Sequence, residues 1–124
     1  MKRIKIIEIK SEIGAGSRGA SLGAAAIKFA ALNRGNELFN KYFPVMVPTE
    51  NYLLFEGAGG FPHARHINGV VRMYEKISET VWDALDKKFF PIVLTGDHSN
   101  AGGVIAGVKM AFPEKRLGVV WIDA

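Results

Sequence analysis

Short apolar runs alternate with stretches of helical periodicity along this chain. Residues 3 to 9 hold four isoleucines in an almost continuous β-branched run, which predicts a strand. Two further apolar runs, at Pro91 to Leu94 and Leu117 to Ile122, predict strands that are buried on both faces. Strands of this kind, separated by helices, form parallel sheets covered on both sides. The pattern therefore predicts an α/β fold of three layers, α/β/α, around a mainly parallel sheet.

The helical segments differ in how clearly the sequence marks them. The expected helices cover residues 21–32, 67–85 and 101–112. The second is the clearest, because apolar side chains recur every three or four positions and charged side chains cover the opposite face. Between the first and the second helix the pattern is irregular. We expect a short helix around Glu37 to Tyr42 there and an extended piece at Tyr52 to Phe55.

Composition narrows the class of protein. With 124 residues, 48% of them hydrophobic and 23% charged, the chain fits one soluble globular domain spanning residues 1–124. The net charge of +4 comes from scattered lysines and arginines, so we expect no nucleic-acid partner. Charged residues interrupt the apolar stretch after Met1, so we expect neither an export signal nor a membrane span, and a cytoplasmic location. The absence of cysteine leaves only nitrogen and oxygen ligands for a metal.

A glycine-rich segment follows the first predicted strand. Gly14, Gly16 and Gly19 form a literal G-x-G-x-x-G pattern between a strand and a helix, which is the context of a dinucleotide-binding loop. The fit fails in detail, because four residues separate the strand from the first glycine and Glu12 would place negative charge near the phosphates. Dinucleotide binding is therefore a minor alternative to a plain loop at the mouth of the sheet.

Polar residues follow the other two predicted strands. His98 lies in the turn after one strand, and Asp123 ends the next, 25 positions further along the chain. That distance suits a right-handed crossover, which would bring both side chains to the same edge of the sheet. An imidazole and a carboxylate meeting there would suit manganese or zinc. The simpler interpretation, an exposed turn histidine and a helix-capping aspartate, remains open on the residues alone.

The motifs around these two residues resemble those of a known family. Leu94 to Ser99, followed at the crossover distance by Gly118 to Ala124, is similar to the first two metal motifs of the arginase family, the manganese-dependent ureohydrolases. The glycine-rich segment, here Ile13 to Gly19, also resembles the loop that follows the family's first strand. The resemblance covers nearly the whole chain and implies the N-terminal part of an arginase-like fold.

The resemblance implies a chemistry as well. Two manganese ions would activate water for attack on the carbon of a guanidino or amidino group, with conversion of arginine to ornithine and urea as the first expectation. His98 would bind one ion and Asp123 would bind metal, bridging both. Members of the family form homo-oligomers, so a homo-oligomer is expected here too.

Most of the family's site has no counterpart in this chain. Four of six metal ligands and the residues that contact substrate would follow Ala124, so we expect a truncated chain that is inactive by itself. A noncatalytic binding or assembly module on the same scaffold is the alternative. His63 and His66 lie before the long helix, and we interpret them as surface or capping residues and not as ligands.

Overall fold

The structure, a computed structural model, describes residues 3–15, 17–57 and 61–123. In chain order its elements are β1 (Arg3–Ile9), the 3-10 helix η1 (Ala20–Leu22), α1 (Gly23–Asn33), α2 (Leu38–Lys41), β2 (Val45–Met46), the 3-10 helix η2 (Asn51–Phe55), α3 (Ile67–Asp86), β3 (Phe89–Thr95), the 3-10 helix η3 (His98–Asn100) and α4 (Ala101–Ala111). The three main helices begin and end close to the positions that the sequence predicts.

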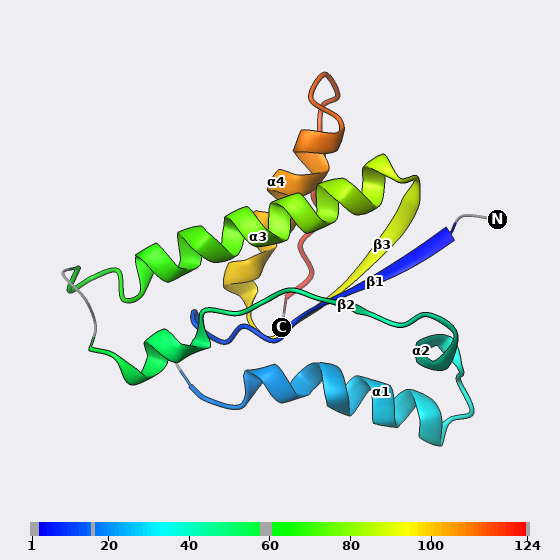
Figure 1. Cartoon of the computed structure of the whole chain (residues 1–124), viewed down its shortest axis with the longest axis horizontal. Helices are drawn as coiled ribbons and strands as arrows, with labels where there is room; N and C mark the ends of the chain where they lie inside the picture. The colour runs from blue at the N-terminus through cyan, green and yellow to red at the C-terminus, as the bar shows by residue number, and fades with distance from the viewer. Residues whose placement is uncertain (1–2, 16, 58–60, 124) are drawn as a thin grey trace.

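Three parallel strands form the sheet, in the order β2-β1-β3 (Figure 1). The central strand β1 pairs along its whole length with β3, from Arg3 opposite Phe89 to Ile9 opposite Thr95. The two-residue strand β2, which the sequence did not predict, lies on the other side of β1. Because the strands are parallel, β1 and β3 end at the same edge, and the loops that follow them meet there.

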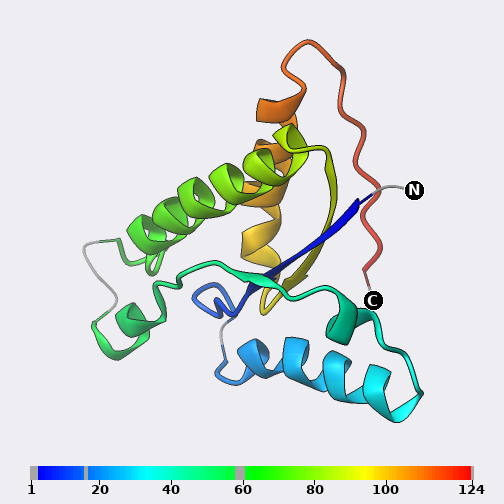
Figure 2. The ribbon, with the colours of Figure 1, turned by 45° about the vertical axis from the view of Figure 1, so that its right-hand side comes forward.

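Helices cover both faces of this sheet, with α3 and α4 on one face and α1 on the other (Figure 1, Figure 2). Successive side chains of β1 alternate between the two faces, as they do in any strand. Ile7 and Ile9 belong to the core against α3, whereas Glu8 lies on the opposite face, and all three are fully buried. The three-layer α/β prediction is therefore confirmed.

Glycines let α4 pack closely against α3. A Cβ atom on Gly103 would lie 2.9 Å from the Cβ of Ile77, and one on Gly107 would lie 2.6 Å from the carbonyl oxygen of Ser78. Real side chains do not approach so closely, so these two positions require glycine. The close approach places Val81 of α3 and its neighbours in the main core.

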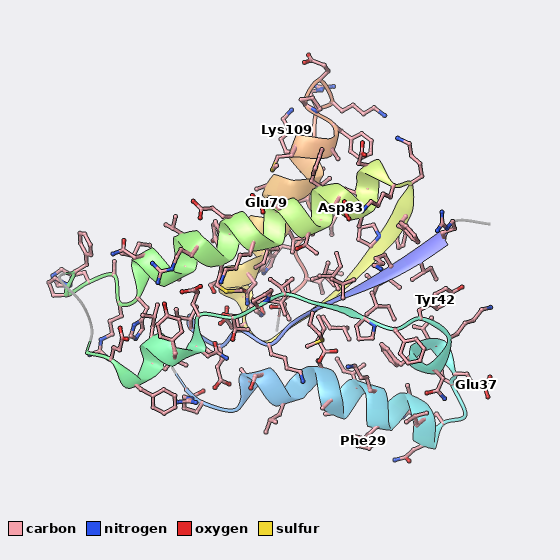
Figure 3. The ribbon with its side chains drawn as sticks, in the orientation of Figure 1. Phe29, Glu37, Tyr42, Glu79, Asp83 and Lys109 are labelled. Carbon is pink, nitrogen blue, oxygen red and sulfur yellow. The ribbon has the colours of Figure 1, made fainter. Side chains whose placement is uncertain are left out.

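The layer formed by α1 is held more loosely. Ala24 is the buried residue of this helix, and Phe29, labelled in Figure 3, is 68% exposed. The main polar contact joins the ammonium group of Lys28 to the carboxylate of Glu8 on β1. An ion pair with a buried carboxylate, and little apolar packing, therefore fixes α1 to the sheet.

The strand β3 was expected to be buried on both faces, but it is only partly buried. Two further predictions for individual segments were wrong. Leu117 to Ile122 forms no strand: it has no regular secondary structure, and the exposed fractions of Val120 and Ile122 are 87% and 91%. A strand needs a neighbour for its hydrogen bonds, and this run pairs with none of the three described strands. The second error lies at Tyr52 to Phe55, which belongs to the 3-10 helix η2 and is not extended.

No helix formed by the described residues has the length and apolar character that crossing a bilayer requires.

Candidate functional site

The turn after β3 is organised by the side chain of Asp97. Its Oδ1 atom accepts a 2.8 Å hydrogen bond from the amide of Ser99 and a second from the Ser99 hydroxyl. Asn100, which is fully buried, donates from Nδ2 to Oγ1 of Thr95 over 2.8 Å. These contacts fix the backbone on both sides of His98, whose own side chain is 72% exposed. The turn therefore presents the imidazole to solvent from a fixed position.

The loop after β1 packs against this turn. The amide of Gly14 donates a 3.0 Å hydrogen bond to Oδ2 of Asp97, and the amide of Gly96 donates to the carbonyl oxygen of Ile9 over 3.0 Å. A Cβ atom on Gly96 would lie only 2.3 Å from the carbonyl oxygen of Ser11. Glycine at position 96 is thus required for the close approach of the two loops.

Glu12 holds the glycine-rich segment in shape. Its Oε1 atom accepts a 2.9 Å hydrogen bond from Nε of Arg18. Its Oε2 atom accepts from the amides of Gly19 and Ser21, over 2.8 and 3.1 Å. The amide of Ser21 and the guanidinium of Arg18 favour the ionised carboxylate and lower the pKa of Glu12 to about 2.

These contacts decide against the dinucleotide alternative. The amide of Gly14 is bonded to Asp97 and that of Gly19 to Glu12, so a phosphate at this loop would meet two carboxylates in place of free N–H groups. Gly16 lies outside the described residues. Dinucleotide binding at this segment is therefore rejected.

The structure brings His98 and Asp123 together, although Asp123 arrives on an irregular segment and not on a strand. Nδ1 of His98 lies 3.8 Å from Oδ2 of Asp123. The ring of Trp121 contacts the imidazole edge-on, with the ring centroids 5.5 Å apart, and its Nε1 atom lies 3.4 Å from Oδ2 of Asp123. The side chains of both proposed ligands are exposed, so solvent and solutes can reach them.

The donors at this position fit a divalent metal in kind but not in number. One imidazole nitrogen and one carboxylate are ligands that manganese and zinc accept. No cluster of three or more such side chains occurs within residues 3–15, 17–57 and 61–123. The pair therefore has the chemistry of a partial metal site.

Sequence reasoning missed the structural roles of Glu12 and Asp97. A signal for Asp97 existed, because an aspartate two residues before a serine is typical of a turn in which the side chain accepts the following amides. Glu12 carried no such signal, since its partners at Arg18 and Ser21 are brought close only by the folded loop. His66 does occupy the N-cap position of α3, as expected, but its side chain makes no capping hydrogen bond there.

The parallel sheet with polar loops at its carboxyl edge defines the chain as an α/β protein of the kind that binds ligands at that edge. A family model described as the arginase family matches residues 2–124, and the chain belongs to that family. This confirms the resemblance to the family's N-terminal portion that the sequence motifs indicated.

Similar proteins and structures agree with this membership. The chain is 31% identical over 123 residues to an arginase of Bacillus subtilis and 31% identical over 128 residues to one of Bacillus caldovelox. These matches cover 99% and 100% of the chain but 40% and 41% of the relatives, so the chain spans about 40% of their length.

Solved structures give the same result. A crystal structure of the Bacillus subtilis arginase superimposes with a TM-score of 0.64 at 29% identity, covering 88% of this chain and 34% of that one. The native Bacillus caldovelox arginase gives a TM-score of 0.65 at 28% identity, covering 89% of this chain and 37% of that one.

Proposed function

We propose that this chain provides part of the metal site of a manganese-dependent hydrolase acting on a guanidino or amidino group. Arginine is the first candidate substrate, with ornithine and urea as products. Membership of the arginase family and the description of the relatives as arginases support this proposal. We also propose that residues 1–124 fold as one domain, which the core shared by β1, α3 and α4 supports.

His98 and Asp123 are the proposed metal ligands. The observation that carries the proposal is the 3.8 Å distance between Nδ1 of His98 and Oδ2 of Asp123 at the carboxyl edge. Bound manganese would lower the pKa of a coordinated water and so supply a nucleophile near neutral pH. Asp97 has a different role, because both of its oxygens already accept hydrogen bonds, one from the amide of Gly14 and one from the amide of Ser99. Its role is to hold the turn that positions the imidazole of His98.

Two ligands hold a metal weakly, so we expect weak metal binding and no hydrolysis by the 124-residue chain. Manganese binding is best followed by electron paramagnetic resonance, in which free and bound ions give different signals. Saturable binding should be weakened by His98→Ala and by Asp123→Asn. It should persist in His63→Ala, which removes an exposed histidine far along the chain from both proposed ligands.

The same titration can contradict the proposal. If the two ligand variants bind manganese as the parent does, or if the parent binds none, His98 and Asp123 do not form a metal site. That result would favour a noncatalytic binding or assembly module on this scaffold. Assays of urea release from arginine and agmatine, and of formiminoglutamate hydrolysis, should show no turnover by the chain alone. Turnover would show that the two ligands suffice.

A further inference from the structure

Helix α1 presents an apolar face to solvent. It forms the outermost layer on its side of the sheet (Figure 1, Figure 2). Four large apolar side chains on α1 and the preceding 3-10 helix η1 have exposed fractions between 46% and 69%: Leu22, Ile27, Phe29 and Leu32. The outer helices of soluble proteins normally place charged or polar residues on their solvent side. An outer helix that is apolar on that side is therefore expected to have a partner that covers it.

The charge of α1 faces inward. Its 11 residues, all of which the structure describes, include one charged residue, Lys28. The ammonium group of Lys28 pairs with the buried carboxylate of Glu8 on β1, so it is directed toward the sheet. Lys28 lies on the same side of the helix as the buried residue Ala24, four positions before it. The outer side of α1, described in full, therefore carries no charged group.

The side chains on the outer side of α1 suit the packing of one helix on another. Ala26 and Ala30 are exposed, and their small side chains lie next to the ring of Phe29. Figure 3 shows Phe29 on the side of α1 away from the sheet. Rows of residues four positions apart are the surfaces through which helices most often pack. A large ring beside two small side chains is self-complementary when two copies meet about a twofold axis.

The exposed area is that of a weak dimer. The four large side chains and the alanines together expose roughly 500 Å² of apolar surface, which is near the upper end of what monomers show. A stable interface takes about 800 Å² from each partner, and smaller interfaces are transient. We propose that the outer face of α1 is the contact surface of a homodimer, in which the α1 helices of two copies pack against each other about a twofold axis.

The lack of charge favours a second copy as the occupant of this face. In a twofold contact each residue meets the same surface of the partner, so a charged face would repel itself. The net charge of +4 already opposes association, and an uncharged contact face adds nothing to that repulsion. A membrane surface is the other occupant to test. Helices that lie on membranes carry lysines or arginines beside their apolar side, whereas Lys28 is paired with Glu8 and turned inward.

Analytical ultracentrifugation of the 124-residue chain tests the dimer. The chain carries Val120→Lys with Ile122→Lys, so that contacts through the apolar C-terminal run do not contribute. Sedimentation should show a reversible equilibrium between monomer and dimer. Phe29→Glu should weaken dimerisation by about tenfold or more, because it places a charge at the centre of the contact. Phe61→Glu, the same change at a phenylalanine that is 54% exposed before α3, should leave dimerisation unchanged.

Cross-linking locates the contact independently. The chain has no cysteine, so one introduced thiol reports on its own surroundings. A short bismaleimide should link two copies of Ala26→Cys, which places the thiol on the outer side of α1. It should link Glu79→Cys, at an exposed position of α3, far less. The thermal unfolding midpoint of each variant should match that of the parent, because every changed side chain is exposed.

Three results would overturn the homodimer. One is a chain that sediments as a monomer at every concentration, and another is equal dimerisation of the Phe29→Glu and Phe61→Glu variants or equal cross-linking of the two cysteine variants. The third comes from vesicles of phosphatidylcholine and phosphatidylglycerol. Binding to these vesicles that Phe29→Glu abolishes, in a chain that does not dimerise, would assign the face to a lipid surface.

Discussion

The amide of Gly14 and the carboxylate of Asp97 form a 3.0 Å hydrogen bond between segments that lie 83 positions apart in the sequence. The bond joins the loop after β1 to the turn after β3 at the carboxyl edge of the sheet. Asp97 is 7% exposed, and its other oxygen accepts from Ser99. The carboxylate is therefore a structural link between the two loops that carry the candidate site.

Asp97→Asn should destabilise the fold by about 1 to 3 kcal/mol, because the new amide would turn a donor toward the N–H group of Gly14 or Ser99. Urea unfolding measures the loss. Asp86→Asn, at the exposed end of α3, is the control and should change the free energy of unfolding by less than about 0.5 kcal/mol. Equal stability of the two variants would show that the link between Gly14 and Asp97 contributes little.

Gly107→Ala should destabilise the protein by about 1 to 3 kcal/mol, because the added methyl group would meet the Ser78 carbonyl oxygen at 2.6 Å. The helices α3 and α4 would have to separate to accept it. Gly23→Ala makes the same change at the start of α1, where nothing lies within 4 Å of the new atom. Thermal unfolding should show a lower midpoint for the first variant and no loss for the second. Similar midpoints would contradict the close packing.

Acid should weaken the fold through two buried carboxylates, Glu12 and Glu50. Hydrogen bonds from Lys76 and Arg72 lower the pKa of Glu50 to about 2, and the pKa of Glu12 is also about 2, against an ordinary value of 4.5. The unfolded chain therefore takes up protons first as the pH falls. The stability that these groups contribute is complete above pH 4.5 and is lost as the pH falls toward about 2.

Unfolding midpoints measured across this pH range test the effect. Glu12→Gln and Glu50→Gln should each lower the midpoint at neutral pH and flatten its fall in acid. Glu79→Gln, which changes an exposed carboxylate labelled in Figure 3, should keep the parent profile. A parent profile that stays level between pH 4.5 and 2 would contradict the lowered pKa values.

The exposed run from Leu117 to Ile122 should promote association of the chain with itself. Apolar, β-branched side chains without a paired neighbour favour contacts between molecules. Light scattering coupled to size-exclusion chromatography should show a mass that rises with concentration. The double change Val120→Lys with Ile122→Lys should reduce it, whereas Glu37→Lys, far from this run and labelled in Figure 3, should do so less. A parent that is monomeric at every concentration would disprove the prediction.

The fold could be predicted from the sequence where periodicity and burial agree. Helix α3 has a continuous apolar stripe, and Ile77 and Val81 of that stripe are fully buried. The prediction of secondary structure failed where a segment needs a neighbouring strand to become a strand itself. The apolar run from Leu117 to Ile122 has the composition of a strand, but a strand also needs hydrogen bonds from a neighbour, and composition does not record whether one is present.

The candidate site could likewise be predicted only in part. His98 and Asp123 were predicted to meet, and their side chains do lie together, although residues 117–122 do not form the strand on which that prediction relied. Their assignment as metal ligands remains a prediction. The residues that hold the loops around the site were harder to predict. The carboxylates of Glu12 and Asp97 accept hydrogen bonds from backbone amides, which every sequence contains. Such partners become visible only when the loops are folded.

The unequal attachment of the two helical layers has a consequence for local unfolding. Helix α1 is fixed to the sheet mainly by Lys28 and Glu8, whereas α3 buries Met73, Ile77 and Val81 in the core. Opening of α1 should therefore expose less apolar surface than loss of the α3 core, and need less free energy than global unfolding. Amide hydrogens of α1 should exchange with solvent early, while those of β1 and α3 persist, so the domain loses one outer layer before it loses its core.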